Sequence, residues 1–211
     1  MKLILVRHGE THLNKTGRIQ GIDDAPLNAT GRAQARAAAE ALTDDLPFFL
    51  YHSTVARAAE SAGIIADHLH VAASPLDGLE EFDVGELSGL TGKEMREHYP
   101  DFMQCWSEDP STARSPGDET ITEVQERAWR AITGLLESHP TDTVVAVSHH
   151  MTILTIVSKV LGLPLKNFRR LQQNLGGIAR AEITQDRRIL LTLNETWHLR
   201  SLKVEEAFLE N

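Results

Sequence analysis

Short apolar runs alternate with helix-like segments along this sequence, and this alternation is what most limits the folds open to it. Residues 2–7 and 143–148 are rich in aliphatic and β-branched side chains, which is typical of strands buried on both faces. A weaker run covers residues 47–52, and two more cover residues 178–183 and 189–194. Strands separated by helices predict an α/β fold with a mostly parallel central sheet flanked by helices on both faces.

Four segments carry apolar side chains at helical spacing. Thr30 is predicted to cap the first, and the second begins at about Thr54. Thr120 and Glu123 form a capping box that begins the third. The fourth, residues 151–161, is almost entirely apolar, so it predicts either a core helix or a face covered by a second copy of the chain in a homodimer.

The middle of the chain, residues 75–117, interrupts this pattern with several glycines and prolines. Two short helices are predicted within it, at residues 93–98 and 102–107. An insertion of this length is more often a lid or substrate loop than an empty connection. Because no linker or repeat divides the 211 residues, we expect a single domain, residues 1–211, that carries this insertion as a small helical lid.

Charge and cysteine content narrow the classes of function. The 21 Lys and Arg against 30 Asp and Glu give a formal net charge of -9, which disfavours nucleic acid and anionic membrane surfaces as partners. Cys105 is the only cysteine, so no intramolecular disulfide forms and a cytoplasmic location is expected. The apolar run before Arg7 is too short for a signal sequence or a membrane span.

Residues suited to phosphate chemistry follow two of the predicted strands. In α/β sheets, ligands bind beyond the carboxyl ends of the strands. Arg7 offers a planar fork of donors that matches phosphate oxygens, and a neutral imidazole at His8 is a nucleophile for phosphorus. His149 and His150 precede a helix whose free amides favour an anion, and a protonated His149 is expected to sit there.

Two further residues complete the predicted site. Arg57 lies about one turn into the helix that follows the second strand, so its guanidinium is expected at the same crevice. Phosphoryl transfer also needs a proton for the leaving oxygen, which a carboxylic acid supplies. Within the loop at residues 79–85, Glu81 is preferred for this role over Glu80 and Asp83.

Further motifs extend along the chain in a fixed order. They are Leu5-Val6-Arg7-His8-Gly9-Glu10-Thr11 with Asn14, Gly17-Arg18-Ile19-Gln20-Gly21, Asp24-Ala25-Pro26-Leu27, Ser53 with Arg57-Ala58, Leu79 with Glu81 and Gly85, Pro116-Gly117-Asp118-Glu119-Thr120, Val147-Ser148-His149, Asn174, and Asn194-Glu195-Thr196-Trp197-His198-Leu199. This ordered set resembles the histidine phosphatase superfamily, the phosphoglycerate mutase-like proteins, over essentially the whole chain.

The resemblance implies a phosphatase that acts on a small phosphorylated metabolite through a phosphohistidine, with no metal and no cofactor. It implies that His8 is the phosphorylated residue and that Glu81 is the proton donor. The residues implied to hold the phosphoryl group or to line its pocket are Arg7, Asn14, Gln20, Gly21, Arg57 and His149. The similar C-terminal segment favours phosphoserine among the small metabolites that fit.

Two positions depart from the family pattern. Members commonly have Gly after the second histidine, where this chain has His150, and many carry Glu where this chain has Ser88. Both departures are expected to change the shape of the substrate pocket, and His150 is a predicted substrate-binding residue. His198 has two open alternatives: it lies at the edge of the pocket, or it pins the C-terminal segment to the core.

Three other functions compete with a metal-independent phosphatase. A phosphoglycerate mutase returns the phosphoryl group to its substrate, but such mutases generally have longer chains. A non-catalytic relative that binds a phosphate ligand or a protein is expected to lose the nucleophile or the acid, which this sequence keeps. A metal site is disfavoured because histidine pairs such as His68 and His70 lack a matching cluster of Asp or Cys.

Overall fold

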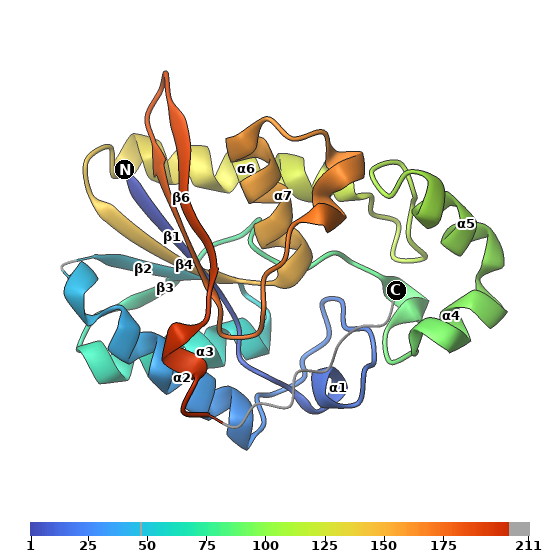
Figure 1. Cartoon of the computed structure of the whole chain (residues 1–211), viewed down its shortest axis with the longest axis horizontal. Coiled ribbons are helices and arrows are strands. Elements are labelled where there is room, and N and C mark those ends of the chain that lie inside the picture. Colours follow the sequence, from blue (N-terminus) through green and yellow to red (C-terminus); the bar gives the residue numbers. More distant parts are fainter. Residues whose placement is uncertain (47, 203–211) are drawn as a thin grey trace.

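The computed structural model describes residues 1–46 and 48–202. They include a six-stranded sheet in the order β3-β2-β4-β1-β5-β6 (Figure 1). The strands are Lys2–Arg7 (β1), Phe49–His52 (β2), Ala73–Pro75 (β3), Thr143–Ser148 (β4), Ile178–Ile183 (β5) and Arg188–Glu195 (β6). The first four strands in that order pair in parallel, and β5 and β6 pair antiparallel. The predicted mostly parallel α/β sheet is confirmed.

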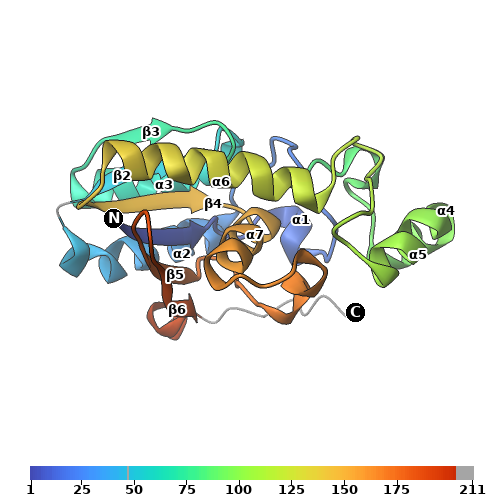
Figure 2. The ribbon, with the colours of Figure 1, turned by 90° about the horizontal axis from the view of Figure 1, so that it is seen from above.

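Helices cover both faces of the sheet. They are Ala29–Ala41 (α2), Ala56–Leu69 (α3), Ile121–Ser138 (α6) and His150–Leu161 (α7). Figures 1 and 2 show α2 and α3 on one face and α6 and α7 on the other. The sheet therefore lies between two helical layers, and its central strands are hidden from solvent.

Strand β1 shows how the sequence produces these layers. Because successive side chains of a strand point to opposite faces, Leu3 and Leu5 pack with α6 and α7, whereas Ile4 and Val6 pack with α2 and α3. All four side chains are fully or almost fully buried. Each such burial contributes about 1.5–3 kcal/mol to folding, so an unbroken apolar run fits only the middle of the sheet.

Helix α7 is a core helix. Its apolar side chains, including Ile153, Ile156 and Val157, are buried between the sheet and α6. Of the two alternatives drawn from its sequence, the structure therefore supports the core rather than a face left open for a second copy of the chain.

Short helices extend the molecule at one end of the sheet. They are His12–Lys15 (α1), Gly92–His98 (α4) and Pro100–Glu108 (α5), and Figure 2 shows α4 and α5 reaching beyond the sheet on the side away from the N-terminus. Side chains of the insertion form a third apolar cluster, in which Phe82 and Val84 pack with Phe102 and Trp106 of α5. The two short helices of the insertion are confirmed, and its role as a lid stays a prediction.

Several boundaries differ from the prediction. Asn28, not Thr30, caps α2: Oδ1 of the Asn28 side chain accepts a 2.9 Å hydrogen bond from the backbone amide of Gly31. Helix α3 begins at Ala56, two residues after the predicted start. The capping box of Thr120 and Glu123 is confirmed. Strand β3 and helix α1, both short, were not predicted.

Among the four helices that cover the sheet, α7 is the most apolar. In the described part of the chain, however, no helix has both the length and the apolar character needed to cross a membrane.

Candidate active site

His8 stands where β1 ends. The register of the sheet pairs Arg7 with Ser148, so His8 and His149 leave the ends of β1 and β4 side by side. The imidazole Nδ1 of His8 lies 2.7 Å from the Gly9 carbonyl oxygen, and Nε2 lies 3.1 Å from Nε of Arg57. Because a carbonyl only accepts and a guanidinium only donates, the proton sits on Nδ1. Nε2 therefore carries the lone pair, which accepts the Nε–H of Arg57 in the ligand-free pocket.

The surroundings of His8 keep this ring neutral. Burial lowers the pKa of His8 well below its ordinary value of 6.5, and the positive charges of Arg57 and Arg7 lower it further. The hydrogen bond to the Gly9 carbonyl opposes these effects without reversing them. A neutral imidazole at the end of a strand is the form that attacks phosphorus.

Two guanidinium groups lie near the His8 ring, that of Arg57 buried and that of Arg7 partly buried. Arg57 donates to the carbonyl oxygens of Gly21, at 2.6 Å, and Asp23, at 3.0 Å. Arg7 donates to the Gln173 carbonyl at 2.8 Å, and its buried Nε has no partner in the described part of the chain. Burial lowers the pKa of Arg7 to about 10, which still leaves it charged near neutral pH. These cations make a site for an anion such as phosphate.

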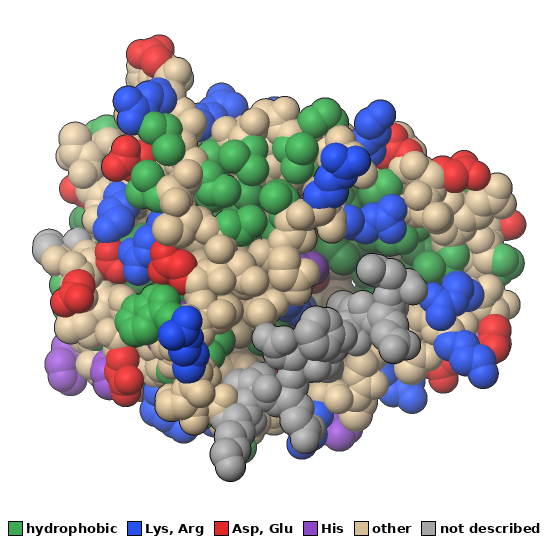
Figure 3. Space-filling model, in the orientation of Figure 1, with side chains coloured by type: hydrophobic (Ala, Val, Ile, Leu, Met, Phe, Trp, Pro, Cys, Tyr) green, Lys and Arg blue, Asp and Glu red, His purple; other side chains and the backbone are tan. Residues whose placement is uncertain are grey.

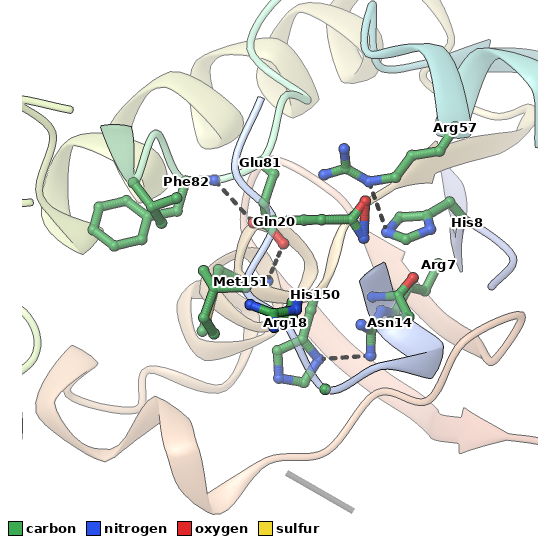
Figure 4. A pocket seen from close by; sticks show the side chains of 13 residues that line it. Arg7, His8, Asn14, Arg18, Gln20, Arg57, Glu81, Phe82, His150 and Met151 are labelled. Atoms are coloured by element: carbon green, nitrogen blue, oxygen red, sulfur yellow. Dashed lines mark hydrogen bonds between the residues drawn. The ribbon is translucent and has the colours of Figure 1, made fainter. Parts of the chain in front are cut away.

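Glu81 faces the same hollow, and its side chain lies against the start of α7. Its carboxylate accepts hydrogen bonds from the backbone amides of Phe82 at 2.9 Å, Met151 at 3.2 Å and Thr152 at 3.3 Å. The last two amides belong to the first turn of α7, where free N–H groups and the helix dipole favour a negative charge. Figure 4 shows Glu81 across the pocket from His8 and Arg57.

The pocket that these residues share has about 660 Å³ of empty space. It is lined by Arg7, His8, Asn14, Gly17, Arg18, Ile19, Gln20, Arg57, Glu81, Phe82, Val84, His150 and Met151 (Figure 4). In Figure 3 a hollow opens between the sheet and the α4–α5 insertion, with basic and histidine side chains visible in it. Charged groups form one side of the pocket, and an apolar wall of Ile19, Phe82, Val84 and Met151 forms the other.

Most of the predicted site residues meet at this pocket. Asn14 and Gln20 both line it, and both contact Thr11: the Asn14 side chain completes a capping box with it, and Gln20 Nε2 donates to its hydroxyl at 2.7 Å. Among the three acidic candidates of the loop, Glu81 lines the pocket, whereas Glu80 and Asp83 do not. This placement supports the preference for Glu81.

His149 lies behind His8 rather than on the pocket wall. The centres of the two rings are 5.1 Å apart, and His149 is 0 % exposed. Its Nε2 lies 2.8 Å from the Ser53 hydroxyl, while its buried Nδ1 has no partner among the described residues. Burial lowers the pKa of His149 well below 6.5, and Arg57 and His8 lower it further. The prediction of a protonated His149 is therefore wrong for the ligand-free pocket, because a buried ring between cations stays neutral.

His150 lines the pocket as predicted. Its Nδ1 lies 3.1 Å from the Gln173 carbonyl oxygen and 3.3 Å from Nη1 of Arg7. Burial lowers the pKa of His150 to about 3, with a further contribution from the Arg7 charge. A neutral imidazole therefore occupies a position where the family commonly has no side chain, and it narrows the pocket beside Arg7.

Besides His149, two further predicted residues lie outside the pocket wall. Gly21 serves through its carbonyl, which holds Arg57, and a side chain at this position would collide with Val84. His198 places Nε2 at 2.9 Å from the Gly176 carbonyl, which supports the alternative that it pins the C-terminal segment to the core.

Among the lining residues that were not predicted for the site, one is charged. Arg18 donates to the Gly89 carbonyl at 2.6 Å and to the Glu94 carboxylate at 3.2 Å. These bonds connect the loop between α1 and α2 to helix α4 of the insertion. Arg18 lies between Gly17 and the Gln20-Gly21 turn, and its nearness to these predicted pocket residues could have indicated that it lines the pocket too.

The histidines outside the pocket do not gather into a metal site. Within residues 1–46 and 48–202, no three or more His, Cys, Asp or Glu side chains form a group that could hold a metal ion.

Comparison with known proteins identifies similar sequences over nearly the whole chain. The family model described as "Histidine phosphatase superfamily (branch 1)" matches residues 3–196. Phosphoserine phosphatase 1 of Hydrogenobacter thermophilus is 31% identical over 205 residues, which are 97% of each chain. Glucosyl-3-phosphoglycerate phosphatase of Mycobacterium tuberculosis is 30% identical over 192 residues, covering 87% of this chain and 84% of that protein.

Solved structures agree with these relatives. A mycobacterial glucosyl-3-phosphoglycerate phosphatase superposes with a TM-score of 0.84 at 28% identity, over 92% of this chain and 98% of that one. YhfR of Bacillus stearothermophilus superposes with a TM-score of 0.87 at 26% identity, over 94% of this chain and 98% of that one.

Proposed function

The chain belongs to branch 1 of the histidine phosphatase superfamily, and from this premise we propose that His8 carries the phosphoryl group in its reaction. The protein is a phosphoric monoester hydrolase, like its relatives named as phosphatases. The observation that carries the proposal is the state of the His8 ring. Its proton is held at Nδ1 by the Gly9 carbonyl, and its Nε2 accepts a hydrogen bond from Nε of Arg57 in a pocket that Arg7 also lines.

The first half of the reaction transfers the phosphoryl group to the enzyme. Nε2 of His8 forms a bond to phosphorus as the bond between phosphorus and the ester oxygen breaks. That oxygen leaves with the electron pair and takes a proton from Glu81.

The second half returns the enzyme to its starting state. The Glu81 carboxylate removes a proton from a water molecule, whose oxygen attacks phosphorus while the bond to Nε2 breaks. Inorganic phosphate leaves, and His8 regains its lone pair. In both steps Arg7 and Arg57 stabilise the charge on the phosphoryl oxygens. His149, 5.1 Å from His8 between ring centres, supports the ring from behind.

Replacement of the nucleophile tests this mechanism. We expect the variant H8A to lose at least about 10³-fold in kcat, since no other group takes over the covalent step. His12, exposed on α1 close in sequence, provides the matched control, and H12A should keep normal turnover. Rapid quenching of the wild-type enzyme with labelled substrate should trap an acid-labile phosphoprotein. Near-normal turnover in H8A would rule the proposal out.

The same phosphoenzyme serves the rival reaction of a phosphoglycerate mutase, which returns the phosphoryl group to an organic acceptor. The open pocket favours water as the acceptor, and the relatives at about 30% identity are named as phosphatases. Incubation with 3-phosphoglycerate and a bisphosphoglycerate primer separates the two reactions. Formation of 2-phosphoglycerate without release of phosphate would favour the mutase.

For the substrate we propose phosphoserine. Phosphoserine phosphatase 1 of Hydrogenobacter thermophilus covers 97% of this chain, and the C-terminal segment is similar to that type. A panel of phosphoserine, 3-phosphoglycerate, sugar phosphates and α-ribazole phosphate, assayed for released phosphate, tests this choice. A kcat/KM for phosphoserine below that of the other panel members would overturn it.

We also propose that the reaction needs no metal. Arg7 and Arg57 already provide two fixed cations for the phosphate oxygens, the role that a metal ion has in other phosphatases. Activity is expected to be unchanged after dialysis against a strong chelator. A sharp loss that a divalent cation restores would contradict this proposal.

The remaining proposals concern the setting of the enzyme. A cytoplasmic location suits a phosphatase of small metabolites with one cysteine. A homodimer would have to use a surface other than α7, which is packed inside the chain. The insertion at residues 75–117 acts as a lid in this proposal, because Val84 and the Glu94 partner of Arg18 connect it to the pocket.

A further inference from the structure

Arg127, on α6, lies outside the pocket but binds the loop that carries Glu81. Its Nη1 donates to the carbonyl oxygens of Gly78 at 3.0 Å and Glu80 at 2.8 Å, and its Nη2 donates to the Glu81 carbonyl at 2.9 Å. The other two donors of the guanidinium bind the Glu119 carboxylate, at 2.7 Å and 3.2 Å. All five N–H groups of this arginine are therefore used, three of them on one short stretch of backbone.

Glu119 extends this contact along the same loop. One of its carboxylate oxygens accepts the amide of Asp83 at 2.9 Å while the pair with Arg127 remains in place. The ion pair is largely buried, with 22% and 17% of the two side chains exposed. Backbone groups of a buried loop need partners that a strand or helix would otherwise supply, and here the ion pair supplies them.

These contacts bear on the position of the Glu81 carboxyl. Two groups set that position: the amides of the α7 first turn hold the carboxylate, and Arg127 holds the carbonyl of the same residue. A general acid must stay within hydrogen-bond reach of the leaving oxygen, and an error of about 1 Å costs about 10²-fold in rate. The guanidinium therefore acts on the geometry of the proton transfer without touching the substrate.

We propose that Arg127, paired with Glu119, is a positioning residue that holds Glu81 in place to protonate the leaving group. This inference rests on the proposed role of Glu81 as the proton donor. A residue that acts through Glu81 has an effect that depends on how much the leaving oxygen needs a proton. A residue that only stabilises the fold has the same effect on every substrate.

Two esters with different leaving groups test the inference. The leaving group of an alkyl phosphate is a strongly basic alkoxide unless its oxygen is protonated. The leaving group of p-nitrophenyl phosphate is a phenolate that is stable without a proton. The reference variant E81Q should lose about 10²–10⁴-fold in kcat/KM on the alkyl ester and far less on the aryl ester. We expect R127M to show the same selectivity, with a loss on the alkyl ester at least about tenfold greater than on the aryl ester.

Additional variants separate positioning from stability. The double variant carrying R127M and E81Q should be no slower on the alkyl ester than E81Q alone, because both substitutions remove the same function, protonation of the leaving group. The variant R127K, with three donors in place of five, should recover part of the activity. Inhibition by inorganic phosphate should be unchanged in R127M, since Arg7 and Arg57 remain. Arg130, exposed on the same helix, provides the matched control R130M.

Each outcome decides the matter. If R127M is unfolded by circular dichroism, E119Q, which keeps the shape of the side chain, takes its place in the same assay. Equal losses of R127M on both esters would overturn the positioning role while leaving the proposed function intact. If E81Q itself shows no dependence on the leaving group, Glu81 is not the proton donor, and the inference falls with that premise.

Discussion

Burial and the charges of nearby arginines set the charge state of each histidine at the pocket. His8 is 2 % exposed, and both Arg57 and Arg7 bring positive charge to it. A free imidazole would be partly protonated just below neutral pH. Here the burial and the two cations keep His8 neutral, so the nucleophile is ready without a separate base.

The pH profile of the enzyme should show this effect. Because the pKa of His8 lies well below 6.5, its nucleophilic form persists as the pH falls from 7.5 to 5.5. We therefore expect no acid limb in kcat/KM centred near 6.5, since kcat/KM reports the groups of the free enzyme. The measurement is kcat/KM for p-nitrophenyl phosphate in a constant-ionic-strength buffer series. A limb near 6.5 that persists when the other histidines near the pocket are replaced would contradict the prediction for His8.

His150 should affect the selection of substrates more than the chemistry. Its neutral ring narrows the pocket beside Arg7, so H150G should widen it. We expect the ratio of kcat/KM for a bulky phosphate ester to that for a small one to rise by about tenfold or more, which corresponds to about 1.4 kcal/mol. The variant H198G, changed outside the pocket wall, is the control. An unchanged ratio in H150G would show that this ring does not contact the leaving group.

The sequence predicted the main site residues because strand ends converge in an α/β sheet. Arg7, His8 and His149 follow strands, and Arg57 begins the next helix, so their meeting needs only the topology. The protonation of His149 was beyond such reasoning, since it depends on burial and on the nearness of Arg57. Whether the residues have the proposed roles stays a prediction that the variants above test.

At the scale of elements, α2 packs backbone to backbone against the loop after β1. A side-chain carbon on Gly31 would lie 2.2 Å from the Glu10 carbonyl oxygen, and one on Gly9 would lie 2.3 Å from the Gly31 carbonyl oxygen. Two glycines therefore allow the first turn of α2 to touch the loop that begins with His8. No larger residue fits at either position without moving one element away from the other.

Substitution of Gly31 should separate these elements. We expect G31A to lower the free energy of unfolding by about 1–3 kcal/mol through overpacking and to lower kcat, because the loop that carries His8 must shift. Gly63, on α3, provides the control: no atom lies within 4 Å of an added carbon there. The variant G63A should be about 0.5–1 kcal/mol more stable with unchanged activity. Denaturant unfolding and steady-state assays check both; a neutral G31A would contradict the packing argument.

Elements were predictable from the sequence where length and periodicity were sufficient. β1, β4 and α6 have long apolar patterns, and their predicted positions agree with the structure. β3 covers three residues and includes Pro75, so no period could show it. The start of α2 was wrong because both Asn28 and Thr30 are good capping residues, and only the packing of Gly31 on the loop decides between them.

For the molecule as a whole, three histidines are held in the neutral form by the fold. The pKa values of His8, His149 and His150 all lie below the ordinary 6.5, with burial as the main cause. In the unfolded chain each takes up a proton near pH 6.5, while the folded protein takes it up only at lower pH. The unfolded state therefore binds more protons below pH 6.5, and protonation there favours unfolding.

The stability of the protein should therefore fall with pH below about 6.5. Each of the three histidines lowers the free energy of unfolding by up to about 1.4 kcal/mol per pH unit, until the pH reaches its folded pKa. For His150 that limit lies at about 3. Chemical denaturation at pH 7.0, 6.0 and 5.0 measures the slope. H150G should have a shallower slope than the wild type; equal slopes for the two proteins would contradict the argument.

The pocket has two parts that come from different regions of the molecule. The phosphate side is built on the sheet and α3, by Arg7, His8 and Arg57, whereas the wall opposite includes Val84 and an arginine tied to Glu94 on the insertion. During evolution, mutations within residues 84–117 can therefore change which metabolite is accepted, while the residues proposed for the chemistry, Glu81 included, are inherited intact. The same division tells a protein engineer where to randomise a library: residues 84–117, with the strand ends left alone.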